Sequence, residues 1–177
     1  MTTHVTQERM ITFLLATPMF ESLDPAEMKE MTRIIDVREF AAGDELFHEG
    51  DVGDAWYALY RGKVDVTTSA GTCENEINQL DPGDCFGEIA ILDGQPRSAT
   101  VVALEDSVVL RVTRAAFEQL LAEDDPVAHK LLRHMAISLA QRTRSITERL
   151  SELAAESESA DCHRGVSKIV NETVLRA

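Results

Sequence analysis

The most informative part of the chain is the stretch FGEIAILDGQPRSATVV at residues 86–102, because its residue types suit a phosphate. Gly87 lets the backbone come close to a ligand. The short helical turn expected after it leaves its first amide groups without partners inside the helix, and the helix dipole adds to their attraction for an anion. Arg97 can hold a phosphate through two parallel charged hydrogen bonds, and Ser98 can donate a third. Together these residue types predict a phosphate-binding site.

Glu88 is the one member of this stretch whose charge opposes phosphate binding. Its carboxylate can instead accept a hydrogen bond from a sugar hydroxyl, so the stretch suits a phosphate that is attached to a sugar. A plainer explanation is an acid in the first turn of a helix, where it stabilises the helix dipole. The two explanations are compatible, because a first-turn position is also where Glu88 would meet the sugar.

The composition limits the classes of protein to which the chain can belong. Its 177 residues include 17 basic and 31 acidic side chains, which gives a formal net charge of −14. This length suits one domain with a sizeable core. DNA binding requires basic side chains gathered on one face, so the charge balance argues against direct DNA contact. A small anion can still bind, because Arg97 and nearby amide groups set the local potential.

The sequence also bears on location and metal content. No segment is apolar for long enough to span a bilayer, and the N-terminal residues MTTHVTQERM lack the basic and then apolar order of a secretory signal. The three cysteines have no C-x-x-C spacing and the five histidines are scattered, which argues against a disulfide framework and a metal site. We therefore expect a cytoplasmic protein with no membrane insertion and no metal.

Hydrophobic periodicity and turn signals predict a mainly β domain that follows an N-terminal helical region. The helical region covers residues 7–31, with Asp24 as an N-cap and Pro25 at the first helical position. Eight short strands separated by glycine turns are expected at residues 34–40, 45–48, 55–60, 63–68, 75–80, 84–86, 98–104 and 106–112. This spacing predicts an antiparallel jelly roll, that is, a double-stranded β-helix.

The C-terminal part predicts a long dimerisation helix. Thr113 is expected to cap a helix that ends near residue 123, and Pro126 begins a second helix that ends near Glu156. The second helix has a seam with the coiled-coil spacing of three and four, made of Leu132, Met135, Leu139, Arg142, Ile146, Arg149 and Leu153. The first half of the seam can equally pack on its own β domain. Beyond Arg142 a partner helix fits better, so we expect a parallel homodimer.

These elements predict one binding domain over residues 7–157. It consists of the helical region 7–31, a β roll over 32–112 and C-terminal helices over 113–157, and it is followed by a flexible tail over 158–177. A helix-turn-helix module needs about three helices, which a tail of this length cannot supply.

Several segments resemble, in order and with matching spacing, the cyclic nucleotide-binding domain family. Residues 86–102 are similar to the phosphate-binding cassette of that family, which includes bacterial catabolite activator proteins, kinase regulatory subunits and cyclic nucleotide-gated channels. Further segments resemble the family's N-terminal helices, its glycine-rich hairpin, the next turn and the turn before the cassette: residues 18–23, 47–57, 61–64 and 81–84. The resemblance covers roughly residues 12–155.

The resemblance implies a set of ligand-binding residues. A cyclic phosphate would dock on main-chain amides, on Arg97 and on Ser98, while the ribose hydroxyl meets Glu88. The implied cassette contacts are Gly87, Glu88, Ile89, Ala90, Arg97, Ser98 and Ala99, of which Ile89, Ala90 and Ala99 would give backbone amides and place their side chains in the core. Less specifically, the resemblance places Val66, Ile77 and Asn78 on the base and sugar side of the pocket. Plain strand packing explains the two aliphatic residues equally well.

Arg142 has two explanations that the sequence leaves open. An arginine on a dimer seam costs stability unless it finds a carboxylate or a phosphate. It can reach Glu88 or the ligand, so that binding locks the long helix in place. It can instead pair with an acid such as Glu148 of the partner helix.

The resemblance implies a homodimeric sensor of cyclic AMP or cyclic GMP that signals through a ligand-biased C-terminal helix to an unidentified protein partner. Ser98 resembles the cyclic-AMP-responsive bacterial proteins, whereas cyclic-GMP kinases have threonine there, which favours cyclic AMP. No nucleophile–base pair or metal cluster accompanies Glu88, so we expect no catalysis. Three alternatives stay open: a degenerate fold that senses another phosphorylated metabolite, a dimeric transcription-regulator-like protein that acts through a separate partner, and a subunit that inhibits a kinase or gates a channel.

Overall fold

The computed structural model describes the backbone of residues 5–70 and 73–174 and the side chains of residues 5–68 and 78–152. The chain divides into two compact units, Met1–Met135 and Ala136–Ala177. The first unit holds the eight strands and the shorter helices, and the second holds most of the long helix α5. Each unit is described by itself.

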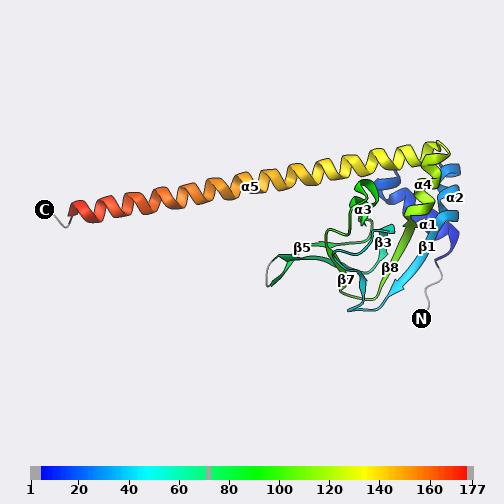
Figure 1. The fold of residues 1–177 in the computed structure, drawn as a ribbon, viewed down its shortest axis with the longest axis horizontal. Helices are drawn as coiled ribbons and strands as arrows, with labels where there is room; N and C mark the ends of the chain where they lie inside the picture. The colour runs from blue at the N-terminus through cyan, green and yellow to red at the C-terminus, as the bar shows by residue number, and fades with distance from the viewer. Residues whose placement is uncertain (1–4, 71–72, 175–177) are drawn as a thin grey trace. The chain divides into compact units, whose positions relative to one another are not determined.

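The eight strands form two four-stranded antiparallel sheets (Figure 1). One sheet has the order β1-β8-β3-β6 and the other has the order β2-β7-β4-β5. The strands are β1 Ile35–Phe40, β2 Glu45–Phe47, β3 Ala55–Arg61, β4 Val64–Ala70, β5 Cys73–Leu80, β6 Cys85–Phe86, β7 Thr100–Ala103 and β8 Ser107–Thr113. The predicted jelly roll is confirmed, and each strand end lies within two residues of its predicted position.

Strand β3 shows how this fold buries both faces of one sheet. Tyr57 and Leu59 pack between the two sheets, whereas Trp56 and Ala58 pack on the opposite face. Successive side chains of a strand point to opposite faces, so a strand covered on both sides needs apolar residues throughout. The sequence AWYALY meets this requirement, which explains why β3 is central to the roll.

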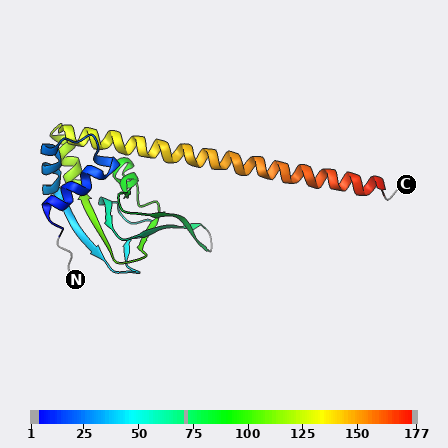
Figure 2. The ribbon, with the colours of Figure 1, turned by 180° about the vertical axis from the view of Figure 1, so that it is seen from behind.

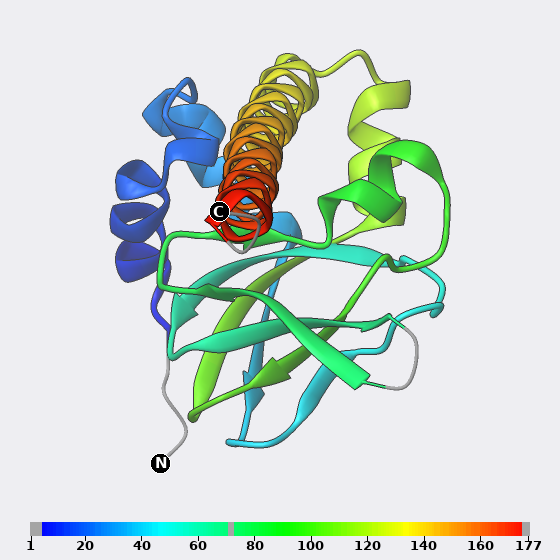
Figure 3. The same ribbon diagram turned by 90° about the vertical axis from the view of Figure 1, so that its left-hand side faces the viewer.

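Helices cover the outer face of the β1-β8-β3-β6 sheet (Figures 2 and 3). They are α1 Gln7–Ala16, the 3-10 helix η1 Pro18–Phe20, α2 Pro25–Ile34 and α4 Arg114–Ala122. Leu14, Phe20, Met28 and Phe117 reach from these helices into the cluster that contains Trp56. This packing ties the helical region to the sheet that holds β3 and β8.

The predicted starts of two helices are confirmed. Asp24 accepts hydrogen bonds from the amides of Ala26 and Glu27, and the Glu27 carboxylate accepts one from the Asp24 amide, which forms a capping box before Pro25. Thr113 caps α4 by accepting a hydrogen bond from the Ala116 amide. Both caps satisfy amide groups that have no partner inside the helix.

Helix α5 spans Pro126–Val174 and corrects the predicted C-terminal boundaries. The sequence pattern predicts a helix end near Glu156 and a flexible tail over residues 158–177, but the helix continues to Val174. No proline follows Pro126, and the added segment contains alanine, glutamate, arginine and lysine, which favour helix. Residues 175–177 of the expected tail lie outside the described residues.

The expected seam of α5 has different surroundings in the two units. Met135 is fully buried in the core of the first unit, together with Leu131. This agrees with the simpler explanation for the first half of the seam, packing on its own domain. In the second unit, Ile146 and Leu150 are 58% and 61% exposed. An apolar surface is therefore present along α5 beyond residue 135.

Candidate functional site

Helix α3, Glu88–Asp93, follows strand β6 directly and is framed by two glycines. Gly87 is its N-cap with a φ of 78°, and Gly94 is its C-cap with a φ of 72°. A side chain at Gly87 would be strained at that φ, and its Cβ would lie 2.8 Å from Nη1 of Arg97. The expected helical turn is therefore confirmed, and the glycine lets the arginine lie against the main chain.

The Arg97 side chain is buried beside Gly87, with 3% of the residue exposed. Nη1 donates to the Gly87 carbonyl at 2.8 Å, and Nη2 donates to the Ala55 carbonyl at 2.7 Å. The guanidinium lies over the Phe47 ring, 4.2 Å from its centroid. Its Nε is buried and has no hydrogen-bond partner among the described residues. The arginine side chain therefore points into the roll and is held there by main-chain carbonyls.

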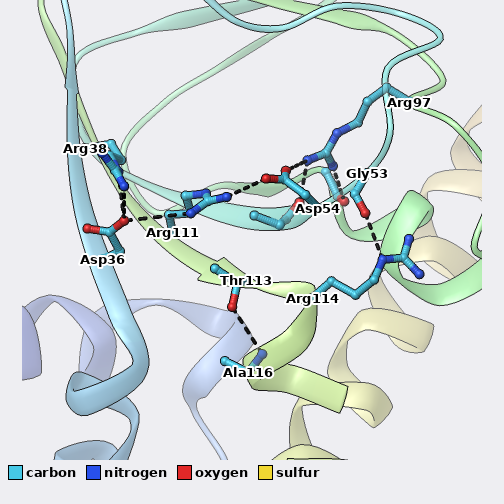
Figure 4. A network of polar contacts seen from close by, with 11 residues as sticks. Asp36, Arg38, Gly53, Asp54, Arg97, Arg111, Thr113, Arg114 and Ala116 are labelled. Atoms are coloured by element: carbon cyan, nitrogen blue, oxygen red, sulfur yellow. Dashed lines mark hydrogen bonds and ion pairs between the residues drawn. The ribbon is translucent and has the colours of Figure 1, made fainter. Parts of the chain in front are cut away.

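Asp54 adds a negative charge beside this guanidinium. Its Oδ1 lies 3.4 Å from Nη2 of Arg97, and its Oδ2 lies 2.5 Å from Nη2 of Arg111 (Figure 4). Burial lowers the pKa of Arg97, although Tyr57 and Asp54 act in the opposite direction. The pKa of an arginine is ordinarily so high that the group stays charged at neutral pH. The site therefore keeps its positive charge.

The loop between β2 and β3 holds the main chain of Arg97 in place. The Gly50 amide donates to the Arg97 carbonyl at 2.9 Å, and the Arg97 amide donates to the Asp51 carbonyl at 2.8 Å. These bonds bring the glycine-rich hairpin next to the cassette. Phe47 and Asp54 had no predicted site role, and the only sequence signal for them was the hairpin pattern that contains both.

The other cassette residues differ in exposure. Glu88 is 1% exposed, Ala90 and Ala99 are buried, and Ser98 is exposed. The expectation that the Ile89 side chain lies in the core is wrong, since that residue is 38% exposed. In α3, Ala90 and the following isoleucine face the core, so Ile89 faces outward. The burial of Glu88 argues against a solvated first-turn acid, because a carboxylate loses hydration when it is buried.

Helix α3 is packed tightly against the same loop. A Cβ added at Gly53 would lie 2.3 Å from the Cβ of Ala90. Arg114, at the start of α4, donates from Nε to the Gly53 carbonyl at 2.9 Å and from Nη2 to the Ala90 carbonyl at 2.5 Å. One arginine therefore fixes α3, the loop and α4 to one another.

The less specific site residues have different surroundings, and one of their side chains is not described. Val66 is partly buried against the core between the sheets, and its strand partner Asn78 is exposed. The side chain of Ile77 lies outside the described residues. Arg142 is an exposed residue of the second unit, so its expected contact with Glu88 stays a prediction.

The described part of the chain lacks both a metal-binding cluster and a membrane-spanning helix. It contains no group of three histidine, cysteine, aspartate or glutamate residues that could hold a metal ion. Its helices include none with the length and apolar character needed to span a bilayer. The cassette contains main-chain amides, a guanidinium and a hydroxyl, which can bind an anion, together with the Glu88 carboxylate.

The packing of Gly53 on Ala90 gives a test of the site's architecture. We expect Gly53→Ala to lower the free energy of unfolding by about 2 kcal/mol, because the added methyl group pushes the loop away from α3. In an Ala90→Gly background the opposing methyl group is gone, so the same change should cost less than about 0.5 kcal/mol. Urea unfolding of the four proteins measures both costs. Equal costs in the two backgrounds would contradict the close packing.

Comparison with known proteins identifies relatives of this fold and site. The sequence profile of the cyclic nucleotide-binding domain matches residues 37–124. A cyclic AMP receptor protein of Thermus thermophilus is 35% identical over 141 residues, which cover 79% of this chain and 63% of that protein. A cAMP-dependent protein kinase regulatory subunit of Aspergillus niger is 34% identical over 118 residues, which cover 67% of this chain and 28% of that protein. The chain therefore spans less than two thirds of either curated relative.

A solved structure matches over almost its full length. The crystal structure of the N-terminal domain of a transcriptional regulator from Streptomyces coelicolor has a TM-score of 0.65 and 31% identity, over 75% of this chain and 93% of that chain. The residues matched by the family profile run from β1 past the end of α4 and include the whole cassette. The chain belongs to the cyclic nucleotide-binding domain family.

Proposed function

We propose that this chain is a cytoplasmic, non-catalytic sensor of a cyclic nucleotide, with cyclic AMP preferred to cyclic GMP. The observation that carries the proposal is the buried Arg97 guanidinium, which is held against Gly87 at the start of α3. A lasting positive charge beside the first amides of a helical turn suits a monoanionic phosphate. The proposed ligand contacts are Gly87, Glu88, Ile89, Ala90, Arg97, Ser98 and Ala99.

The contacts of Arg97 support this role because they orient the guanidinium in advance. Both Nη groups are held by main-chain carbonyls, and the Phe47 ring lies against the face of the guanidinium. Nε is buried without a partner among the described residues, and a buried donor left unpaired costs free energy. A phosphate oxygen that accepts from this arginine would recover part of that cost. Because the guanidinium is already held in place, the Arg97 side chain would lose little conformational entropy when a ligand binds.

Glu88 supports a sugar phosphate over a bare phosphorylated metabolite. Its carboxylate is buried next to Gly87, in the first turn of the helix whose amides would hold the anion. A carboxylate beside an anion site repels the anion, so it is tolerated best where it binds a ligand hydroxyl. The preference for cyclic AMP rests on Ser98 after the arginine, and both curated relatives are named for cyclic AMP.

Calorimetric titration with cyclic AMP and cyclic GMP tests the proposal. We expect heat with both nucleotides and tighter binding of cyclic AMP. Arg97→Ala should weaken the affinity at least about thirtyfold, because it removes a buried charged partner of the phosphate. Arg33→Ala removes the same charge from α2, where Arg33 pairs with Glu30, and should leave the affinity unchanged. Circular dichroism confirms that both variants are folded, and no heat with either nucleotide would refute the proposed function.

The proposed output is a homodimer formed through α5, with a ligand-biased helix that acts on a separate protein partner. Exposed apolar residues of the second unit support such a contact, since Ile146 of the seam and Leu150, four positions later, lie on one face of α5. We propose that residues 7–157 form the binding domain and include the helix through which it dimerises. The signal would arise because the ligand binds more tightly to one arrangement of that helix.

Sedimentation equilibrium tests the dimer. We expect the unmodified protein to be a dimer and Ile146→Asp to be a monomer, because a charge on the apolar seam cannot be buried against a partner. Gln141→Asp changes the charge by the same amount at an exposed position off the seam and should stay dimeric. A monomeric unmodified protein, or a dimeric Ile146→Asp variant, would contradict this assembly.

Arg142 is the residue through which α5 is proposed to meet the pocket. If it binds the ligand or Glu88, Arg142→Ala should weaken nucleotide affinity about tenfold, as expected for the loss of a charged hydrogen bond. Arg144→Ala, at an exposed position of α5 outside the seam, serves as the control and should bind normally. Unchanged affinity of Arg142→Ala would assign this arginine a purely structural role.

A further inference from the structure

Arg111, on strand β8, lies outside the cassette but contacts the groups around Arg97. In the antiparallel register it is paired with Asp36 of β1 on one side and with Tyr57 of β3 on the other. Its Nη2 donates to Oδ2 of Asp54 at 2.5 Å, and its Nη1 lies 3.8 Å from Oδ2 of Asp36. Figure 4 shows Arg111 between the two aspartates. It therefore joins the outer strand β1 to the edge of the site.

Asp54 is shared unequally between two arginines. Its carboxylate lies 2.5 Å from Arg111 but 3.4 Å from Arg97. The side chain of Arg97 is 2% exposed and that of Arg111 is 20% exposed, so both charges lie in surroundings that screen them less than water does. Arg111 is thus the close partner of Asp54, and Arg97 is the distant one.

The unequal distances from Asp54 to the two arginines affect how much of the Arg97 charge is available to an anion. A carboxylate in direct contact with Arg97 would cancel much of its charge, and it would also repel a phosphate. Arg111 reduces both effects, since it draws the carboxylate toward β8 and balances its charge. Burial acts to lower the pKa of Arg111, but hydrogen bonds to Tyr57 and Asp54 outweigh it and raise the pKa, so this balancing charge is permanent.

We propose that Arg111 is a positioning residue for nucleotide binding: it holds the Asp54 carboxylate away from Arg97 and so keeps that guanidinium available for a phosphate. This inference rests on the proposed function. Without Arg111, the nearest cation for Asp54 is Arg97, and the phosphate would have to displace that carboxylate.

A double-mutant cycle with cyclic AMP as the probe tests the inference by calorimetry. We expect Arg111→Gln to weaken the affinity about tenfold, and Asp54→Asn to leave it equal or tighter. In the Asp54→Asn background, Arg111→Gln should weaken the affinity no more than about twofold, because no carboxylate remains to compete for Arg97. Arg33→Gln is the matched control for the loss of one positive charge and should bind as the unmodified protein does.

The outcomes are distinct. A merely structural role of Arg111 predicts the same loss in both backgrounds, and that result would overturn the inference, as would an unchanged affinity of Arg111→Gln. If Asp54→Asn weakened the affinity for cyclic AMP as much as Arg111→Gln does, the inference would also be overturned. Asp54 would then orient Arg97 rather than compete with the phosphate for this arginine. Absence of binding by the unmodified protein would refute the proposed function and this inference together. Binding by the unmodified protein with no effect of Arg111→Gln would refute only the inference.

Discussion

The site depends on one guanidinium that the protein encloses almost completely. Burying an arginine costs free energy unless its NH groups find acceptors and its charge is balanced. Arg97 meets this requirement with carbonyls from Gly87 and Ala55, the ring of Phe47 and the carboxylate of Asp54. These groups come from β2, from the start of β3 and from the turn before α3. Arg97 therefore has its partners only when both sheets are assembled, so the fold and the proposed anion site form together.

The same region links the cassette to the C-terminal side of the first unit. Arg114 is the first residue of α4, and it donates to carbonyls of both Gly53 and Ala90. The contact of Gly53 with Ala90 leaves no room for a side chain between them. A displacement of α3 would therefore break bonds to α4 or carry α4 with it. This is a continuous physical connection from the proposed phosphate site to the helix that precedes α5.

Local sequence patterns were enough to predict the strands and the caps, whereas the surroundings of individual side chains depend on the assembled roll. Asp24 and Thr113 cap helices as predicted, because caps depend on neighbours along the chain. The predicted end of α5 was wrong because a small and acidic composition does not stop a helix when proline is absent. Asp54 lies 43 residues before Arg97, and no local signal pairs them. The glycine-rich hairpin showed that this segment matters, but only the β-roll topology shows which groups it brings to the arginine.

The local charge around the cassette makes the proposed anion site compatible with an acidic protein. The chain has a net charge of −14, yet Arg38, Asp36, Arg111, Asp54 and Arg97 form an alternating row in Figure 4. Three arginines and two aspartates leave this row with one excess positive charge. Exposed acids farther away than about 8 Å are largely screened at physiological ionic strength, whereas a buried guanidinium is screened much less. The row and the buried Glu88 carboxylate would therefore set the potential that a phosphate meets, and the distances from the aspartates to the arginines decide how much charge Arg97 retains.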